Sequence, residues 1–132
     1  MNNAETQLTK IVRERLEGLG CHCVKLSDRF TRGVPDLLVV SDRIVMLELK
    51  VFVATDSVHT YQQLGMSGAQ DHHVRQMCRR SLRSAACVTG RADGSRLALW
   101  TPISPESELV PNYRLAASED SQVMNWILGA MS

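Results

Sequence analysis

The sequence predicts an α/β fold in which helices flank a central sheet. Three features support this prediction. Apolar side chains in residues 4–19 recur every three or four positions, as on one face of a helix. Residues 33–50 contain two short apolar runs around a polar turn, which is typical of a buried hairpin. A second helix is expected to begin at Ser67 and to lead into two further strands.

The first predicted helix carries one acid on its apolar side. At about 100° per residue, Glu5 falls on the side of the apolar residues, whereas Glu14 and Glu17 fall on the other side. Glu5 is therefore either a functional acid that faces inward or a first-turn glutamate favoured by the helix dipole. Gly18 or Gly20 supplies the end of the helix. The apolar residues are Leu8, Ile11, Val12, Leu16 and Leu19.

The hairpin from Gly33 to Lys50 brings two acids and a lysine together. Its strands are joined by a polar turn centred on Asp42, and Asp36 and Glu48 are equidistant from that residue. Residues directly opposite each other in an antiparallel pair have Cβ atoms about 4.5–5.5 Å apart. Side chains alternate along a strand, so Glu48 and Lys50 share one face.

These residues are suited to a metal site. Apolar residues on both faces of the hairpin indicate a covered sheet. Asp36 and Glu48 would then repel each other and lose hydration, and a divalent cation relieves both effects. Oxygen-only ligands favour Mg²⁺ or Mn²⁺ over zinc. Lys50 can orient or deprotonate an attacking water and neutralise charge on a phosphate. The sequence therefore predicts metal-assisted phosphodiester hydrolysis.

Basic residues precede this site in the chain. A short strand over Cys21–Leu26 is predicted to lead into a polar loop. Lys25, Arg29 and Arg32 lie in or beside this loop, just upstream of the first acid of the hairpin. They are either solvated loop charges or phosphate contacts, and their position beside the predicted metal favours phosphate contact.

The second helix is expected to begin with a capping box. Ser67 occupies the N-cap position and Gln70 lies three residues on, which gives Gln70 a structural role. Arg75, Arg79 and Arg83 repeat at intervals of four, with Arg80 alongside. These arginines form either a solvated face, the interpretation we favour, or a surface that grips a phosphate backbone. Arg75 and Arg79 are the candidates for DNA contact on this helix.

The rest of the chain predicts further strands and a closing helix. Strands are expected over residues 85–89 and 96–101, joined by a turn that contains Asp93-Gly94. Three prolines then indicate an irregular crossing, and residues 119–130 have the pattern of a helix. We expect one domain over residues 1–132, in which residues 102–132 form a C-terminal extension.

Composition and charge exclude several classes of protein. The net charge is only +1, so any nucleic-acid surface has to be local. The longest apolar runs fall far short of the roughly 20 residues that span a membrane. Because the amino terminus has no apolar signal region, we expect a protein of the cytoplasm.

The four cysteines match neither zinc-site spacings nor a small disulfide scaffold. We expect reduced, partly buried thiols. Cys21-His22-Cys23 is a weaker alternative, as a set of metal ligands.

The motifs resemble the PD-(D/E)xK nuclease superfamily. Pro35-Asp36 matches its PD element, and Glu48-Leu49-Lys50 matches its ExK element. The run from Gly33 to Leu38 and the Ser67–Gln70 box look more closely like the VRR-NUC branch, which includes small stand-alone phage and bacterial proteins and is related to Holliday-junction resolvases. The resemblance covers about residues 4–100. It implies a restriction-endonuclease-like core, with a central mixed β-sheet flanked by helices in αβββαβ order.

The resemblance also implies roles for the site residues. Asp36 and Glu48 would ligate Mg²⁺, for which Mn²⁺ would substitute, and the Leu49 backbone carbonyl and Glu5 would be further ligands. Lys50 would serve the attacking water, and Gln70 would position the site. Glu14 remains a rival to Glu5 as the helix acid of the family.

The implied function is a Mg²⁺-dependent DNA endonuclease that cuts branched DNA such as a Holliday junction, in repair or recombination, and acts as a homodimer. Two alternatives stay open. One is a catalytically idle nuclease fold that binds DNA or protein, and the other is a phosphohydrolase of nucleotides or RNA. The joint presence of Asp36, Glu48, Lys50 and Gln70 argues against an idle module, which has no need for all four.

Overall fold

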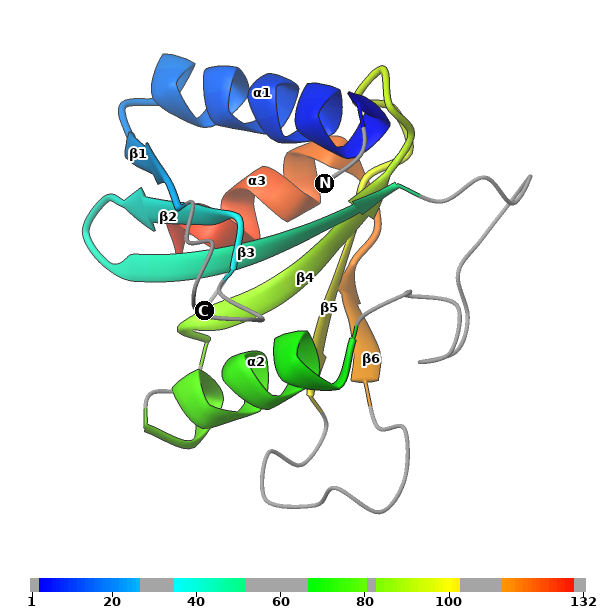
Figure 1. Cartoon of the computed structure of the whole chain (residues 1–132). Coiled ribbons are helices and arrows are strands. Elements are labelled where there is room, and N and C mark those ends of the chain that lie inside the picture. Colours follow the sequence, from blue (N-terminus) through cyan, green and yellow to red (C-terminus); the bar gives the residue numbers. More distant parts are fainter. Residues whose placement is uncertain (1–2, 27–34, 52–66, 81–82, 103–112, 130–132) are drawn as a thin grey trace.

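The computed structural model describes residues 3–26, 35–51, 67–80, 83–102 and 113–129. Figure 1 shows three helices and six strands in this part of the chain. In chain order they are α1 (Asn3–Gly18), β1 (His22–Lys25), β2 (Leu37–Val40), β3 (Ile44–Val51), α2 (Gly68–Arg80), β4 (Ala85–Gly90), β5 (Ala98–Pro102), β6 (Tyr113–Ala117) and α3 (Asp120–Leu128).

The six strands form one mixed sheet in the order β1-β2-β3-β4-β5-β6. β3 and β4 are parallel, and the other neighbours are antiparallel. The parallel pair needs a crossover, and the segment that contains α2 supplies it. Helix α1, strands β1 to β3, helix α2 and strand β4 reproduce the αβββαβ order of a restriction-endonuclease-like core. The predicted fold class is therefore confirmed.

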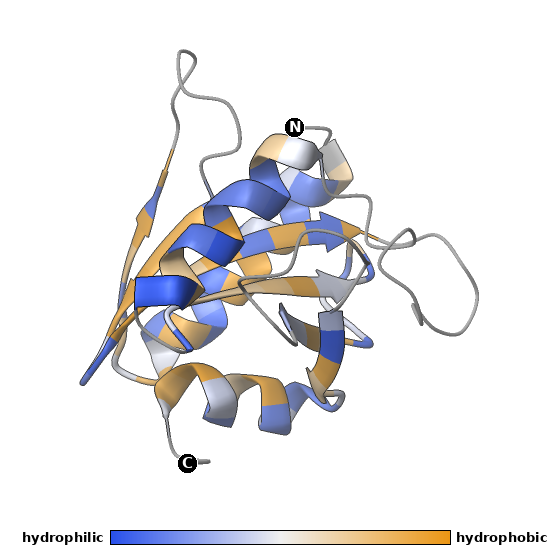
Figure 2. Ribbon diagram, turned by 90° about the horizontal axis from the view of Figure 1, so that it is seen from below, coloured by the Kyte–Doolittle hydropathy of each residue, from blue (hydrophilic) through white to orange (hydrophobic). Residues whose placement is uncertain are grey.

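Helices cover both faces of the sheet (Figure 1). The larger apolar cluster joins α1 and α3 to one face of the strands. The smaller cluster joins Val74 and Cys78 of α2 to the other face of β4, β5 and β6. In Figure 2 the central strands are mostly orange, the colour of apolar residues, whereas the helices carry both colours. The covered sheet that the hairpin predicted is thus present.

Helix α1 follows its predicted bounds closely. Leu8, Val12 and Leu16 are completely buried against the sheet, as their spacing requires. The helix ends at Gly18, and Gly20 has a positive φ of 95° that suits glycine. The prediction is wrong for Leu19, which lies beyond the helix end and is 53% exposed, so it is not part of the buried face.

The hairpin of β2 and β3 has the predicted register. Val40 pairs with Ile44 and Leu37 with Leu47, so the turn is centred on Asp42. The second predicted hairpin, β4–β5, is also present. Its turn places Gly94 at a φ of 81°, and the Arg91 N–H donates to the Ser95 carbonyl over 2.9 Å.

Strand β6 was not predicted from the sequence. Its five residues pair with β5 across an irregular step at Leu99/Trp100, which weakens the alternation of exposed and buried side chains. α3 follows it and buries Val123 and Ile127 in the larger apolar cluster. The division of the chain at residue 102 stays a prediction.

The expected solvated stripe of arginines on the second helix is wrong in part. Arg79 and Arg80 are exposed, but Arg75 is only 2% exposed. Arg83 follows the helix at a φ of 65°, and its guanidinium lies 4.8 Å from the centre of the Trp126 ring. The stripe assumed one continuous helix, whereas α2 ends at Arg80.

All four cysteines are buried free thiols, as expected. Burial raises the pKa of the Cys21 and Cys23 thiols, so both favour the protonated form, and His22 between them is exposed. In the described part of the chain, neither α1, α2 nor α3 is long and apolar enough to cross a membrane.

Candidate active site

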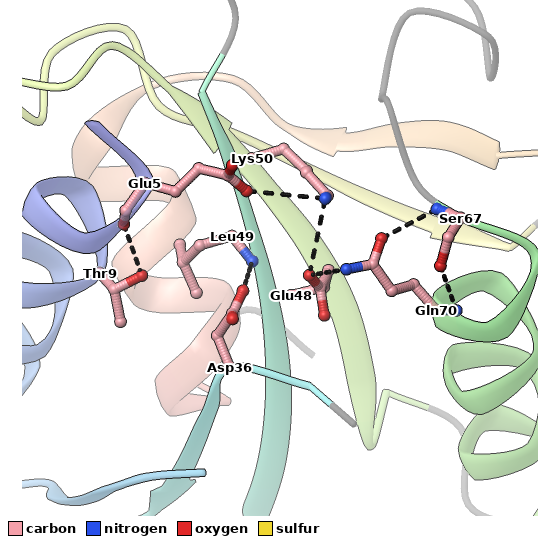
Figure 3. A network of polar contacts seen from close by, with 8 residues as sticks. All are labelled: Glu5, Thr9, Asp36, Glu48, Leu49, Lys50, Ser67 and Gln70. Carbon is pink, nitrogen blue, oxygen red and sulfur yellow. Dashed lines mark hydrogen bonds and ion pairs between the residues drawn. The ribbon is translucent and has the colours of Figure 1, made fainter. Parts of the chain in front are cut away.

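The predicted site residues meet at the carboxyl end of β3 (Figure 3). The pairing of β2 with β3 stops at Leu37 and Leu47, whereas the pairing of β3 with β4 continues to Val51. Glu48 and Lys50 therefore extend beyond the hairpin partner. The first turns of α1 and α2 supply the remaining residues from either side of this strand end.

Glu48 is the most enclosed of these groups. It is 2% exposed, and the residues before and after it on the strand, Leu47 and Leu49, are completely buried. Its Oε1 accepts a 2.8 Å hydrogen bond from Gln70 Nε2, while its buried Oε2 has no hydrogen-bond partner. Burial and then the neighbouring Asp36 carboxylate raise the pKa of Glu48 from 4.5 to about 9.

Asp36 is fixed against β3 by the backbone. Its Oδ2 accepts a 2.8 Å hydrogen bond from the N–H of Leu49, beyond the last residue that pairs with β2. The strand pairing itself ends at Leu37 and Leu47; extended by one step, its register would set Asp36 opposite Glu48, the arrangement that the sequence predicts. Leu49 therefore contributes its N–H to the site through Asp36. Its predicted role as a carbonyl ligand stays a prediction.

Lys50 lies between two acids in Figure 3. Its Nζ is 3.6 Å from Glu5 Oε1 and 4.0 Å from Glu48 Oε1. Lys50 and Glu5 are 17% and 18% exposed, so solvent screens their ion pair only partly. The structure thus brings Glu5 to the site, whereas Glu14 is exposed on α1.

Gln70 forms the predicted capping box and also contacts Glu48. The Ser67 N–H donates to Gln70 Oε1 over 2.9 Å, and the Gln70 N–H donates to Ser67 Oγ over 3.1 Å, so the capping box is formed. Because the box uses the amide oxygen as an acceptor, the amide nitrogen is left to face Glu48. The helix cap therefore orients the hydrogen bond that holds the buried carboxylate.

The donors fit a hard divalent cation. Asp36 and Glu48 both offer carboxylate oxygens and are close enough for Asp36 to raise the pKa of Glu48, whose buried Oε2 lacks a partner that a cation would supply. Among the described residues, no group of three or more acids, histidines and cysteines is close enough to form a complete ligand set. Mg²⁺ commonly binds through one or two carboxylates and keeps several waters, so two acids suffice.

The candidates for DNA contact that the structure describes lie on different elements. Lys25 is exposed at the end of β1, and Arg79 is exposed on α2. Arg29 and Arg32 lie outside the described residues. Arg75 does not suit the predicted contact, because it is buried and donates to Asp71 over 2.9 Å, so a phosphate cannot reach it without breaking that pair.

Sequence reasoning missed two residues next to the site. Asp71 follows Gln70, and the Tyr113 hydroxyl donates to Asp71 Oδ1 over 2.7 Å. The two residues lie 42 positions apart on different elements, so no local pattern links them. The available signal was the spacing of four positions between Asp71 and Arg75, which suits an ion pair on a helix.

A scan of protein-family models and a search of curated proteins return no match to this chain. A search of solved structures finds a VRR_NUC domain with 26% sequence identity. The alignment covers 67% of this chain and 86% of that domain, at a TM-score of 0.47. It is the domain that the sequence motifs resemble. We base the proposed function on the geometry of the site.

Proposed function

We propose that this chain is a Mg²⁺-dependent DNA endonuclease that is selective for branched DNA. The observation that carries the proposal is the buried Glu48 carboxylate, which has one unpartnered oxygen and lies beside Asp36 and within 4.0 Å of Lys50. A buried acid with one unpartnered oxygen beside a second acid is costly to ionise, and a bound divalent cation offsets that cost.

Each residue has a distinct role in this proposal. Asp36 and Glu48 would hold the ion, with waters and the Leu49 carbonyl completing its ligands. When bound, the ion supplies positive charge to the phosphate and lowers the pKa of a water. Gln70 fixes the Glu48 carboxylate through its 2.8 Å hydrogen bond. Glu5, 3.6 Å from Lys50, keeps that ammonium beside the reacting group rather than in solvent.

The substrate and partners extend the same proposal. Lys25, Arg29, Arg32 and Arg79 are the candidate contacts to the DNA backbone, which has to be gripped locally because the net charge is only +1. A homodimer would set two such sites on the two strands of a junction. We place the activity in the cytoplasm, in repair or recombination.

Cleavage of labelled DNA tests the proposal. The purified protein is incubated with a four-way junction, a flap, a splayed arm and a linear duplex, each with Mg²⁺, Mn²⁺ or EDTA. We expect symmetric, metal-dependent cuts in the junction. Cuts in flaps or linear duplex would support nuclease activity but contradict the proposed selectivity for junctions. Tight DNA binding without cleavage in either metal would contradict the enzyme and support the idle module.

Metal binding is expected to release close to one proton per protein at neutral pH. Because the pKa of Glu48 is raised to about 9, its carboxyl is protonated in the metal-free protein, and a cation competes with that proton. The affinity for Mn²⁺ should therefore tighten about ten-fold per pH unit between pH 6 and 8. Calorimetry in buffers of different ionisation enthalpy measures the proton release.

The control for this experiment is Glu14→Gln, which changes an exposed acid on α1 and should release the same proton. A binding heat that is identical in all buffers would mean that Glu48 is already ionised, and would contradict the prediction.

A further inference from the structure

The first turn of α2 holds Gln70 in place with little apolar support. Ser67 and Gly68 are exposed, and Gln70 is only partly buried. The first completely buried apolar side chain of the helix is Val74, one turn further on. The apolar packing of the helix against the sheet therefore begins one turn after Gln70. Another contact has to hold the turn that faces Glu48.

A polar triangle supplies that contact. Asp71 Oδ1 accepts a hydrogen bond from the Tyr113 hydroxyl over 2.7 Å and another from Arg75 Nε over 2.9 Å. The Arg75 guanidinium lies 5.4 Å from the centre of the Tyr113 ring, and it is 2% exposed. Each member thus contacts the other two. The arginine balances the charge of the acid, so the carboxylate is tolerated at this partly buried position.

The triangle is coupled to the site through the backbone. Asp71 is adjacent to Gln70, and its own N–H donates to the Ser67 carbonyl over 3.0 Å. A shift of Asp71 would therefore move both members of the capping box. Tyr113 lies on β6, outside the residues that resemble the nuclease family, and its strand does not contribute any of the site residues.

We propose that Tyr113 and Asp71 are positioning residues, whose hydrogen bond holds the first turn of α2 so that Gln70 Nε2 stays on the Glu48 carboxylate. The inference rests on the proposed function, since the orientation of Glu48 matters only if that carboxylate binds a metal. It assigns the final strand of the sheet a part in the site. Groups that orient a metal ligand commonly change affinity or activity about 10–100-fold when they are removed.

The test compares two deletions of a single hydroxyl. Tyr113→Phe removes the hydrogen bond at the amino end of α2. Ser84→Ala removes a 2.9 Å hydrogen bond to the Met77 carbonyl near the other end of the same helix. Both hydroxyl residues are buried, at 8% and 7% exposure, so each variant removes one hydrogen bond made by a buried residue. They differ in their distance along the helix from Gln70.

We expect Tyr113→Phe to weaken Mn²⁺ binding and to lower kcat by about 10-fold each, with KM for DNA unchanged. The side-chain NH₂ signals of Gln70, assigned in NMR spectra by their loss in Gln70→Glu, should shift toward those of a solvated amide. Ser84→Ala should change none of these quantities. Equal effects of the two variants, or an unshifted Gln70 signal in Tyr113→Phe, would overturn the inference.

A second variant and readouts that do not depend on cleavage keep the test decisive. If Tyr113→Phe does not fold, Asp71→Asn replaces it, because the asparagine keeps an acceptor oxygen but loses the charge that strengthens the bond. Because it also removes the charge that balances the buried Arg75, it should produce the same changes at equal or larger size, and unchanged Mn²⁺ affinity and Gln70 signals would overturn the inference. The NMR and Mn²⁺ measurements do not need cleavage. A wild-type protein that cuts no DNA would therefore remove the proposed function, while these readouts still decide the role of Tyr113.

Discussion

Glu48→Gln is expected to lower metal-dependent cleavage by about 10³-fold, equivalent to ~4 kcal/mol of transition-state stabilisation, while the metal-free protein does not lose stability. The two effects have one cause. The carboxylate that would bind the ion is buried with an unpartnered oxygen, and burial and Asp36 together make its charge unfavourable in the metal-free fold. The amide keeps the shape of the side chain and removes that charge.

The raised pKa of Glu48 also predicts how the free energy of unfolding of the metal-free protein changes with pH. The pKa of Glu48 is raised from 4.5 in the unfolded chain to about 9 in the fold. The folded state then binds more protons than the unfolded state between these values, so the contribution of Glu48 to stability is full below the lower pKa. It is lost as the pH rises through the higher pKa. In EDTA, the free energy of unfolding of the wild type should fall from pH 5 to 9.

Thermal or denaturant unfolding in EDTA across this pH range measures the difference between the proteins. Glu48→Gln should lack the part of the fall that Glu48 causes, and should be the more stable protein at high pH. Glu14→Gln, an exposed acid-to-amide change on the same domain, should keep both the pH dependence and the cleavage. A Glu48→Gln protein that unfolds at every pH would mean that the acid is structural.

Lys50→Met should have the second-largest effect, a loss of about 10²–10³-fold in cleavage rate with metal binding retained. Lys50 is 4.0 Å from the Glu48 carboxylate, so removal of its charge takes away a competitor of the cation rather than a ligand. Mn²⁺ affinity should stay within about three-fold of wild type or tighten. The methionine keeps most of the apolar stem of the lysine, which limits loss of packing.

Single-turnover cleavage measures the chemical step and Mn²⁺ titration measures metal binding, and both are performed on the same preparation. Lys10→Met is the matched control, because it replaces an exposed lysine of α1 with the same side chain. Unchanged cleavage in Lys50→Met would exclude Lys50 from the chemistry. A large loss of Mn²⁺ affinity would instead make Lys50 a residue that organises the metal site.

Local patterns in the sequence were enough to predict most elements. The apolar period of residues 4–19 predicted α1, and the Asp93-Gly94 turn predicted the β4–β5 hairpin. The equal distance of Asp36 and Glu48 from Asp42 predicted the register that brings the two acids together. These features depend on neighbouring residues, whose spacing directly determines faces and turns.

Contacts between distant residues were decided by the tertiary structure alone. The sequence left Glu5 and Glu14 as rival acids on the first helix, and only the packing of α1 on the sheet brings Glu5 to Lys50. It assigned Arg75 to the surface although Asp71 lies four positions before it on the same helix. Only the packing of β6 beside α2 encloses that arginine between Asp71 and Tyr113.

Gln70 makes one contact that the local sequence predicts and one that only the tertiary structure decides. The capping box could be predicted because its two hydrogen bonds join residues three positions apart. The contact of its amide nitrogen with Glu48, 22 positions away, depends on how the crossover lays α2 on the sheet. The sequence by itself thus determined the helices, the hairpins and the pair of acids, since local spacing controls them. The tertiary structure decided which side chains complete the site, because burial and long-range packing set those contacts.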